Sequence, residues 1–451
     1  MVSAGVPEWA AYLEALAAFG MRPGLERVSA LLEALDRPQD AYRVIHVVGT
    51  NGKSSTTRYC EALLRAHGLR AGAYLSPHIS GWTERVVVDG CPVDEAVFAA
   101  CVEAVRAATA SLPEDVGETT QFEVLTVAAL LAMAESGVEA VALEAGLGGR
   151  LDATNVAAAS VVVLTNIALE HTEVLGGTRE LIFAEKAAVI KGGDVVFGAL
   201  DGLEVQARRV CSAAGARPHF LRDEARDEAA SGRGEALPRG DLSVAGSPGD
   251  FSVAFAAPGG REEWSGLSLP TPALYQVVNA GLAVAAVRLL LGRLDEAAAR
   301  GALAATAVPG RLQKVGKHPL VLADGAHNPD GVRVLAQSLA AVDVPRPTVG
   351  VLAIMSDKGY DEMLERFLPL LDAVVCTQAG EPRSLTAEEL AAALRAAAAR
   401  LGRPLPEVRV APDPHEALAL AREWAGPDGS VLIGGSLYVL EDLRDVLVSP
   451  G

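Results

Sequence analysis

Short runs of β-branched and other apolar residues alternate along the chain with longer segments rich in Ala and Leu. The short runs have the length of buried strands, and the longer ones repeat apolar residues at helical spacing. The predicted strands cover residues 44–48, 138–143, 161–165 and 195–197, and then 320–323, 348–354, 373–377 and 431–433. This alternation is typical of parallel sheets covered by helices, and we therefore predict an α/β protein.

A different texture separates the two series of strands. Residues 222–261 are rich in Asp, Glu, Arg, Gly and Pro, and within them Phe251, Val253 and Phe255 alternate before the turn sequence "APGG". This pattern predicts a loop and then an antiparallel hairpin at the edge of the first sheet.

The boundary between two domains is predicted after the next helix. That helix is expected over residues 274–291, and the Pro-Gly break in "ATAVPGRLQ" follows it where the second series of strands begins. A chain of this length exceeds a single comfortable hydrophobic core. We therefore predict an N-terminal domain of residues 1–308 and a smaller C-terminal domain of residues 309–451.

The charge balance argues against polyanionic partners. The chain of 451 residues has 39 Lys and Arg against 57 Asp and Glu, which gives a formal net charge of -18. Such a chain repels nucleic acid and anionic membrane surfaces. We expect small-molecule substrates, and an acidic substrate would need local cations or metal ions in its site.

Cysteine usage and hydropathy favour the cytoplasm. The five cysteines show no C-x-x-C spacing, which fits a reducing compartment. The N-terminal segment carries Glu8 and Glu14 without a basic stretch, so it predicts a first helix and not a signal peptide. The longest uncharged run, residues 265–287, contains Pro270 and Pro272, and its helical part is too short to span a bilayer.

The segment "RVIHVVGTNGKSSTT", residues 43–57, joins an apolar strand to a helix through a loop with two glycines and a lysine. This order brings backbone N–H groups, a lysine and a helix N-terminus to one point, where they can bind phosphate. Lys53 would bridge the β- and γ-phosphates of a nucleotide, and a hydroxyl of Ser54 or Ser55 would hold Mg²⁺. The alternative is a glycine turn with a solvated lysine.

Two further strand ends carry candidate metal ligands. Glu144 follows the apolar run "VAL" at the carboxyl edge of the first sheet, where a carboxylate can reach a metal ion. His171, in "NIALEHTEVLG", follows the next strand and falls on the same edge. A solvated glutamate and a structural histidine are the alternatives, and the residues alone leave both open.

Lys186 lies on the apolar stripe of a predicted helix. In "ELIFAEKAAVIKGG" it is in line with Ile182, Val189 and Ile190 at helical spacing. Many such lysines extend their amine to the surface. The sharper hypothesis is a desolvated amine with a lowered pKa, which is neutral often enough to react or to be modified.

The second series of strands also ends in polar loops. A polar D-x-x-H-N-P sequence directly after a strand favours a site over a surface turn. Three successive strand-end loops with charged tips predict a lined cleft. These loops carry Asp324, His327 and Asn328, then Asp357 and Lys358, then Arg383 and Ser384.

Nine motifs together resemble one family. They are "GTNGKSST", "SPHISGWTERV", "TQFEVLT", "EAGLGGRLDATN", "EHTEVLG", "AEKAAVIK", "PGRLQ", "DGAHNP" and "GSLYVL". In this order they resemble the folylpolyglutamate synthase and dihydrofolate synthase family, within the Mur ligase superfamily. The resemblance implies a P-loop parallel-sheet ATPase domain followed by a smaller Rossmann-like α/β domain. It also implies a monomeric ATP-dependent ligase that adds L-glutamate to a folate. Addition of L-glutamate to dihydropteroate is left open as a second reaction.

The resemblance assigns roles to individual positions. ATP would contact Gly49, Thr50, Asn51, Gly52, Lys53, Ser54, Ser55, Asn279, Arg311 and Asp324. Mg²⁺, expected as two ions, would bind Ser54, Ser76, Glu144 and His171. Lys186 matches a lysine that is carbamylated in the family. The catalytic set would be Lys53, Lys186, Asp324 and His327. Substrate contacts would fall on Pro77, His78, Arg85, Thr120, Phe122, Arg150, Asp152, His327, Lys358 and Arg383.

The implied chemistry has a physical rationale. A carboxylate is a poor electrophile, so ATP first converts it into an acyl phosphate, which the amine of glutamate then attacks. Mg²⁺ and Lys53 offset the repulsion between the carboxylate and the γ-phosphate. His327 either accepts the proton of the amine or orients glutamate, and the residues alone do not choose between these roles.

The chain departs from the family pattern at two positions and leaves several alternatives open. Ser54 replaces the glycine that commonly follows the lysine of the loop, and Glu170 replaces an aspartate before the histidine. A Mur-type cell-wall amino-acid ligase is the nearest rival, and a P-loop nucleotide switch without ligase activity is the rival from another class. Whether Ser54 or Ser55 contacts Mg²⁺, and which of the two folate reactions occurs, also stays open.

Overall fold

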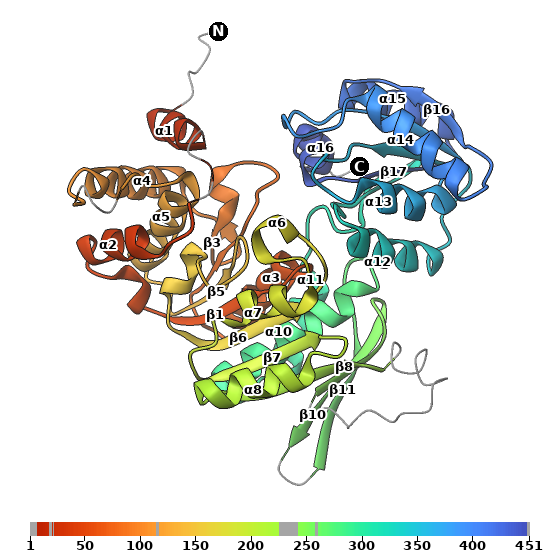
Figure 1. The fold of residues 1–451 in the computed structure, drawn as a ribbon. Coiled ribbons are helices and arrows are strands. Elements are labelled where there is room, and N and C mark those ends of the chain that lie inside the picture. The colour runs from red at the N-terminus through yellow and green to blue at the C-terminus, as the bar shows by residue number, and fades with distance from the viewer. Residues whose placement is uncertain are drawn as a thin grey trace. The chain divides into compact units, whose positions relative to one another are not determined.

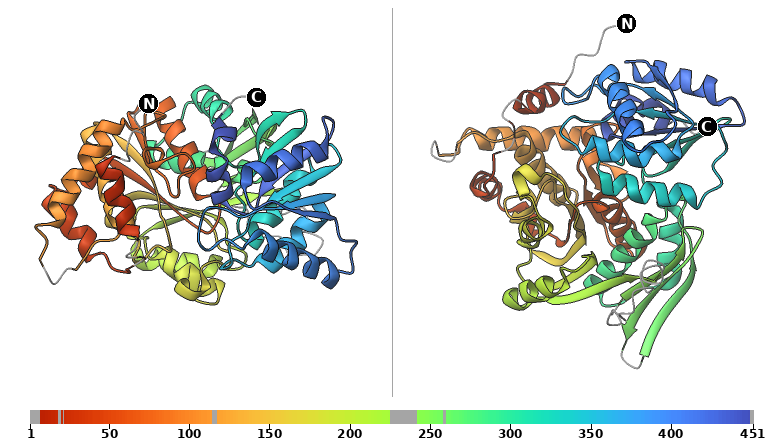
Figure 2. Two further views of the ribbon diagram at one scale, coloured as in Figure 1. Left: turned by 90° about the horizontal axis from the view of Figure 1, so that it is seen from above. Right: turned by 45° about the vertical axis from the view of Figure 1, so that its right-hand side comes forward.

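The structure is a computed structural model that describes residues 7–17, 20, 22–113, 117–224, 242–257 and 260–448. The chain divides into two compact units. Unit 1 comprises Met1–Gly246, Phe251–Leu267 and Val278–Thr306, and unit 2 comprises Ser247–Asp250, Ser268–Val277 and Ala307–Gly451. Figure 1 and Figure 2 show the ribbon of both units.

An eleven-stranded sheet forms the framework of unit 1 (Figure 1). The central strands pair in parallel, and the chain adds antiparallel strands at both edges. In spatial order the strands are β11 (Gly260–Leu267), β10 (Asp250–Ala257), β9 (Leu242–Ser247), β8 (Arg217–Asp223), β7 (Asp194–Ala199), β6 (Ala159–Asn166), β1 (Arg43–Val48), β5 (Ala140–Glu144), β2 (Ala71–Tyr74), β3 (Val86–Val88) and β4 (Cys91–Pro92).

Helices pack on this sheet because its central strands are apolar on both faces. Val44 of β1 packs in a core with residues of α1, α2, α4 and α5, and Val48 packs in a second core with residues of α7 and α8. The helices of this part of the chain are α1 (Glu8–Leu16), α2 (Glu26–Ala34), α3 (Lys53–Ala66), α4 (Glu95–Thr109), α5 (Gln121–Glu135), α6 (Thr172–Leu175), α7 (Arg179–Ala187), α8 (Glu204–Ala214), α10 (Tyr275–Leu291) and α11 (Glu296–Ala305).

Unit 2 contains a six-stranded sheet that is parallel except for the edge strand β12. Its strands, in spatial order, are β12 (Gln313–Lys317), β13 (Leu320–Ala323), β17 (Ser430–Gly434), β14 (Thr348–Leu352), β15 (Ala373–Cys376) and β16 (Glu407–Val410). Its helices are α12 (Pro329–Ala340), α13 (Tyr360–Phe367), α14 (Ala387–Arg400), α15 (Pro414–Ala425), α16 (Leu437–Asp442) and α17 (Arg444–Val448). Apolar residues of α12, α13 and α14 share one core with this sheet.

The predicted fold class is confirmed, and each predicted strand has a counterpart in the structure. The predicted hairpin is also confirmed, since β10 and β11 pair antiparallel at the edge of the first sheet. The strand predicted over 348–354 is shorter and ends at Leu352. Much of the predicted loop, residues 225–241, lies outside the described residues, as do two residues of the "APGG" turn.

Short strands such as β2, β4, β9 and β16 were not predicted from the sequence. β2 and β4 contain no β-branched residue, and β4 consists of Cys91 and Pro92 alone. Among the described residues, no helix combines the length and the apolar character that a membrane crossing requires.

Candidate active site

Two glycines shape the loop between β1 and α3. Gly49 has φ 149° and Gly52 has φ 83°, which are conformations that favour glycine. A Cβ atom on Gly49 would lie 1.9 Å from the hydroxyl oxygen of Thr165, and one on Gly52 would lie 2.4 Å from the side-chain oxygen of Asn279. The loop therefore passes so close to β6 and α10 that larger residues do not fit.

The end of β6 holds this loop through its backbone. Asn166 accepts the Thr50 N–H at its carbonyl oxygen, at 3.1 Å, and the Asn51 N–H at its side-chain oxygen, at 2.8 Å. The hydroxyl of Thr165 donates to the Asn51 carbonyl at 2.6 Å. These bonds fix the loop at the N-terminus of α3, where the first N–H groups lack acceptors within the helix and can bind an anion.

Two lysines donate to carbonyl groups of the same loop. Lys53 Nζ lies 3.0 Å from the Thr50 oxygen, and Lys186 Nζ lies 2.8 Å from the Gly49 oxygen. Lys186 is buried, and burial together with the positive charge of Lys53 lowers the pKa of Lys186 to about 7. The prediction of a desolvated amine at position 186 is therefore confirmed.

A buried carboxylate at the end of β5 faces the start of α3. Glu144 is 1% exposed. Its Oε1 accepts the hydroxyl of Ser54 at 2.8 Å, and its Oε2 accepts the N–H of Ser76 at 3.1 Å. Ser55, the next residue, is buried near the start of α3. The hydroxyl of Ser54 is thus bonded to the buried carboxylate.

His171 lies on the loop after β6, at the N-terminus of α6. It adopts a left-handed conformation with φ 50°, and its Nε2 lies 3.9 Å from Glu170 Oε1. Within the part of the chain that the structure describes, no group of three or more His, Cys, Asp and Glu side chains is arranged to hold a metal ion. Hydrogen bonds thus connect Ser54 and Ser76 to Glu144, and His171 stands beside Glu170.

The loop between β2 and β3 forms a compact cluster around Arg85. Arg85 is 9% exposed. Its guanidinium donates to His78 Nδ1 at 2.8 Å and to Ser76 Oγ at 3.4 Å, and lies 5.4 Å from the ring centre of Trp82. Burial and the charge of Arg85 lower the pKa of His78 to about 4, so that its ring is neutral and accepts this bond at pH 7. Pro77 lies between Ser76 and His78 in this cluster.

Four other residues predicted to contact substrate have local partners. Thr120 caps α5 in a reciprocal capping box, and the ring of Phe122 lies against Gly146. Arg150 donates to Glu185 Oε1 at 2.9 Å. The carboxylate of Asp152 is buried and accepts backbone N–H groups of its own loop, and burial raises its pKa. The contacts of these residues define local structure, and their predicted roles toward substrate stay predictions.

In unit 2 a buried aspartate organises the loop after β13. Asp324 is 2% exposed, and burial raises its pKa. It accepts the Tyr275 hydroxyl at 2.6 Å and the N–H groups of Leu312 and Ala326 at 2.8 Å each. The carboxylate therefore joins the start of α10 to the segment that precedes β12.

The remaining predicted residues of unit 2 surround the strand ends. His327 Nδ1 donates to the Gly325 carbonyl at 2.8 Å, and a Cβ atom on Gly325 would lie 2.6 Å from the guanidinium of Arg311. Lys358 follows β14, and its backbone N–H donates to the Met355 carbonyl at 3.2 Å.

Arg383 already has anionic partners. It donates to Asp357 Oδ2 at 2.9 Å and to Glu381 Oε1 at 2.8 Å, and its guanidinium lies 5.7 Å from the ring centre of Tyr438. An anionic substrate that binds Arg383 would therefore compete with two carboxylates of the same unit.

Comparison with known proteins shows the family of this chain. Residues 47–197 match the Mur ligase middle domain, and residues 310–437 match the Mur ligase glutamate ligase domain. The dihydrofolate synthase/folylpolyglutamate synthase of Mycobacterium tuberculosis is 36% identical over 82% of this chain and 77% of its own length. The chain belongs to the dihydrofolate synthase/folylpolyglutamate synthase family. The resemblance seen in the motifs is thus confirmed, and the protein is an ATP-dependent ligase with two Mur ligase domains.

Solved structures of this family agree with the fold along nearly the whole chain. The folylpolyglutamate synthase of Mycobacterium tuberculosis complexed with ADP and AMPPCP has a TM-score of 0.85 and 32% identity, and the match covers 98% of this chain and 100% of that chain. A bifunctional folylpolyglutamate synthase/dihydrofolate synthase with Mn, AMPPNP and L-glutamate bound has a TM-score of 0.81 and 30% identity, covering 98% of both chains.

The donors at the phosphate loop fit a hard divalent cation. The side chains of Glu144 and Ser54 meet there and present oxygen atoms, which are the ligands that Mg²⁺ prefers in proteins, and the backbone N–H of Ser76 donates to the same carboxylate. A carboxylate that is almost fully buried is also costly without a cation close to it. The residues present therefore fit the Mg²⁺ that the family resemblance implies.

Sequence reasoning missed two residues that organise these sites. Asn166 holds the phosphate loop, and Tyr275 donates to Asp324. Asn166 directly follows a predicted strand, so the same strand-end argument that singled out Glu144 could have found it. Tyr275 opens a helix, and its partner lies 49 positions away, so no local pattern indicated it.

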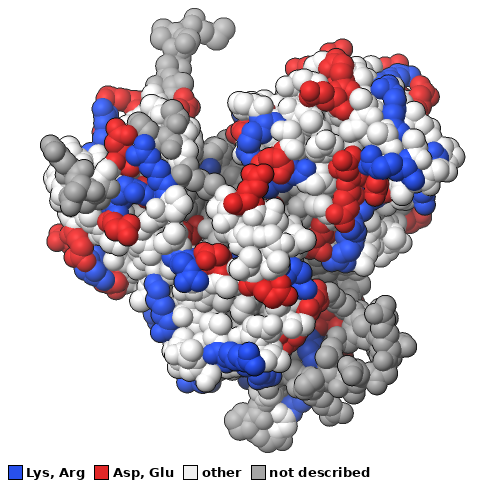
Figure 3. All heavy atoms as spheres, viewed as in Figure 1, with Lys and Arg blue, Asp and Glu red and all other residues white. Residues whose placement is uncertain are grey.

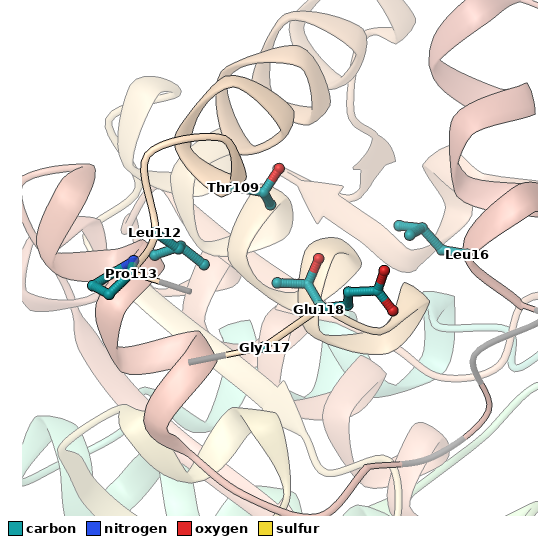
Figure 4. A pocket seen from close by; sticks show the side chains of 7 residues that line it. Leu16, Thr109, Leu112, Pro113, Gly117 and Glu118 are labelled. Carbon is teal, nitrogen blue, oxygen red and sulfur yellow. The ribbon is translucent and has the colours of Figure 1, made fainter. Parts of the chain in front are cut away.

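The hollow on the surface of the described residues does not coincide with the predicted site. Figure 3 shows basic and acidic side chains intermixed on the face that it presents. A hollow of about 390 Å³ lies at the C-terminal end of α4 and is lined by Leu16, Thr109, Leu112, Pro113, Gly117, Glu118 and Thr119. Figure 4 shows these side chains from close by. Among the described residues that line it, none belongs to the predicted site.

Proposed function

We propose that this protein is an ATP-dependent ligase that joins the amine of L-glutamate to a carboxylate of a folate, and also to dihydropteroate. The observation that carries the proposal is the phosphate loop, where Lys53, Lys186 and Glu144 converge. Family membership supports the ligase chemistry, and the bound ADP, AMPPCP, AMPPNP and L-glutamate of the related structures support the substrates.

The two domains divide the work in this proposal. Residues 1–308 bind ATP through the phosphate loop, and residues 309–451 form the glutamate ligase domain. The match to the glutamate ligase domain family over residues 310–437 supports the second assignment. Asn279 and Arg311 would contact the nucleotide, Asp324 would organise the loop that meets it, and His327 would receive or orient glutamate.

The reaction begins with transfer of the γ-phosphate to the acceptor carboxylate, which releases ADP and forms an acyl phosphate. Both reactants are anions, so positive charge must stand between them. Lys53 supplies that charge, and the N-terminus of α3 adds N–H donors to the phosphates. The glutamate amine then attacks the acyl carbon, loses a proton, and expels phosphate as the amide forms.

Mg²⁺, which we propose binds as two ions, supplies further positive charge to the phosphates when it is present. Ser54, Ser76, Glu144 and His171 would hold it. Lys186 would be carbamylated, which turns its amine into an anion. Carbamylation needs a neutral amine, and a pKa of about 7 leaves Lys186 neutral about half of the time at neutral pH.

Acceptor binding is assigned to the cluster around Arg85. Arg85 supplies a cation and the neutral ring of His78 an aromatic group, which suit the carboxylate and the aromatic parts of a folate. Pro77, Thr120, Phe122, Arg150 and Asp152 would complete this site, and Lys358 and Arg383 would contact glutamate. We further propose a cytoplasmic monomer.

A phosphate-release assay tests the function. ATP, Mg²⁺ and L-glutamate are combined with dihydropteroate, tetrahydrofolate or a muramyl peptide. We expect phosphate release that requires both glutamate and a folate-type acceptor. Release with the muramyl peptide but with neither folate-type acceptor would indicate a cell-wall ligase. Release of phosphate at the same rate with and without glutamate would indicate a nucleotide switch.

A further inference from the structure

A chain of buried polar side chains lies beneath the glycine-rich loop that follows β5. His46 of β1 is 1% exposed, and its Nε2 lies 2.8 Å from the hydroxyl oxygen of Thr154, which is fully buried. The Thr154 hydroxyl donates in turn to the carboxylate of Asp152. His46 is a polar interruption in a strand whose neighbours Val44 and Val48 are apolar core residues.

The direction of these hydrogen bonds follows from the donors available. Asp152 accepts the N–H groups of Leu147 and Thr154, at 2.8 Å and 3.0 Å, and also the single proton of the Thr154 hydroxyl. With Asp152 ionised, the hydroxyl oxygen accepts from His46 Nε2–H. Burial lowers the pKa of His46 to about 3, so its ring is neutral and holds one proton for this bond.

The loop above this chain approaches three helices at distances that leave no room for a Cβ atom. Three of its glycines make these contacts, so a small shift of the loop would displace its neighbours. A Cβ would lie 2.4 Å from the ring of Phe122 if placed on Gly146, 2.9 Å from Leu175 if placed on Gly148, and 2.9 Å from the Cα atom of Lys186 if placed on Gly149.

We propose that His46 is a positioning residue for the ligase reaction: through Thr154 and Asp152 it fixes the loop of residues 146–155, and thereby the position of Lys186. The inference rests on the proposed function, because it concerns the lysine assigned to that chemistry. An apolar residue at position 46 would fill the core without the desolvation that a buried imidazole and hydroxyl require. The polar chain therefore serves the position of the loop.

The hydrogen bonds from His46 through Thr154 to Asp152 predict which kinetic constant changes when His46 is replaced. Thr165 and Asn166 hold the backbone of the phosphate loop through hydrogen bonds that do not involve His46, so a shift of Lys186 leaves these bonds in place. Removing the His46 donor should therefore leave the KM for ATP near its original value. The value of kcat should fall about tenfold to a hundredfold, since small displacements of a reacting group have effects of this size.

The experiment compares four variants of the full chain with the unmodified protein. His46→Leu fills the space without a donor, His46→Gln restores an N–H donor, and Thr154→Val keeps the shape without the hydroxyl. Tyr42→Phe is the matched control, because it removes another buried hydrogen bond of unit 1, from the Tyr42 hydroxyl to the Leu130 carbonyl at 3.1 Å. Kinetics of phosphate release and hydrogen exchange of residues 146–155 are measured for each.

We expect His46→Leu and Thr154→Val to lower kcat alike, to leave the KM for ATP unchanged and to increase exchange in the loop. Combining them should cost little more than either alone, since the two groups act in one chain. The kcat of His46→Gln should be at least about threefold higher than that of His46→Leu, because the net contribution of one restored hydrogen bond changes a rate by about this factor. Tyr42→Phe should retain the original kcat.

Two results would overturn the inference. One is a folded His46→Leu or Thr154→Val protein with the original kcat and loop exchange, and the other is an equal loss of kcat in Tyr42→Phe. Failure of the proposed function gives a different result, since the unmodified protein would then release no phosphate in response to glutamate. If His46→Leu does not fold, the comparison of Thr154→Val with Tyr42→Phe decides.

Discussion

The strand-end loops of the two units use their charged residues in opposite ways. In unit 1, Lys53 and Lys186 donate to backbone carbonyls of the phosphate loop, and Glu144 accepts from Ser54 at the start of α3. In unit 2, the buried carboxylate of Asp324 holds its own loop, and Arg383 is paired with carboxylates.

This difference separates charge that is available for a ligand from charge that maintains the fold. A lysine amine bonded to a carbonyl retains its positive charge, so Lys53 still attracts phosphate. An arginine between two carboxylates is largely neutralised before any substrate arrives. The phosphate loop of unit 1 is therefore the preorganised part of the site, and unit 2 must rearrange its ion pairs to bind an anion through Arg383.

The largest effect is expected from Lys53→Ala. Because this lysine supplies charge where phosphate is transferred, we expect glutamate-dependent phosphate release to fall by about 10²- to 10³-fold. The matched control is Lys317→Ala, which changes an exposed lysine of unit 2 and should leave turnover unchanged. Near-normal turnover in Lys53→Ala would contradict the assignment of the phosphate loop.

Position 186 tests whether the second lysine acts as an anion. Lys186→Ala should lose most activity, whereas Lys186→Glu supplies a carboxylate and should retain at least about tenfold more, which corresponds to about 1.4 kcal/mol in the barrier. Steady-state phosphate release measures both variants. Equal losses would count against a carbamate at this position.

The pH dependence gives an independent test of the same residue. Since the pKa of Lys186 is about 7, its amine becomes protonated as the pH falls below 7 and can then no longer add CO₂. We expect added bicarbonate to stimulate activity above pH 7 and to have a decreasing effect below it. In Lys186→Glu bicarbonate should have no effect at any pH, and stimulation of that variant would contradict the explanation.

In unit 2 the comparison predicts a loss of stability. Asp324→Asn places an amide opposite the Leu312 N–H and should lower the free energy of unfolding by about 1–3 kcal/mol. Asp343→Asn changes an exposed aspartate of the same unit and should have little effect. Thermal unfolding measures both variants. If Asp324→Asn kept its stability but lost as much turnover as Lys53→Ala, Asp324 would belong with the chemical groups.

The smallest effect concerns the serine pair. Ser54 donates to Glu144, and Ser55, the next residue, is buried. If Ser54 holds Mg²⁺ as proposed, Ser54→Ala should raise the Mg²⁺ concentration needed for half-maximal activity about tenfold, since loss of a group beside a metal has effects of this size. A Mg²⁺ titration of Ser55→Ala should match that of the unmodified protein, and the opposite pattern would assign the metal contact to Ser55.

Local sequence patterns predicted the candidate site residues that are marked by their place in a single strand or helix. Glu144 was found because it ends an apolar strand, and Lys186 because it falls on the apolar stripe of a helix. Asn166 also ends a predicted strand and was overlooked, whereas His46 was missed because its partner lies 108 positions away and only the folded sheet brings the pair together. Short strands such as β2 and β4 were missed for the same reason as His46, since pairing with a neighbour defines them more than composition does.

Transfer of oxygen from the acceptor tests the central claim most directly. The acceptor carboxylate is labelled with ¹⁸O, and the released phosphate is analysed by mass spectrometry after the ligation with L-glutamate. Because the acyl phosphate keeps one carboxylate oxygen on phosphorus when the amine attacks, we predict one ¹⁸O atom in each phosphate released. Amide formation with unlabelled phosphate would contradict the account.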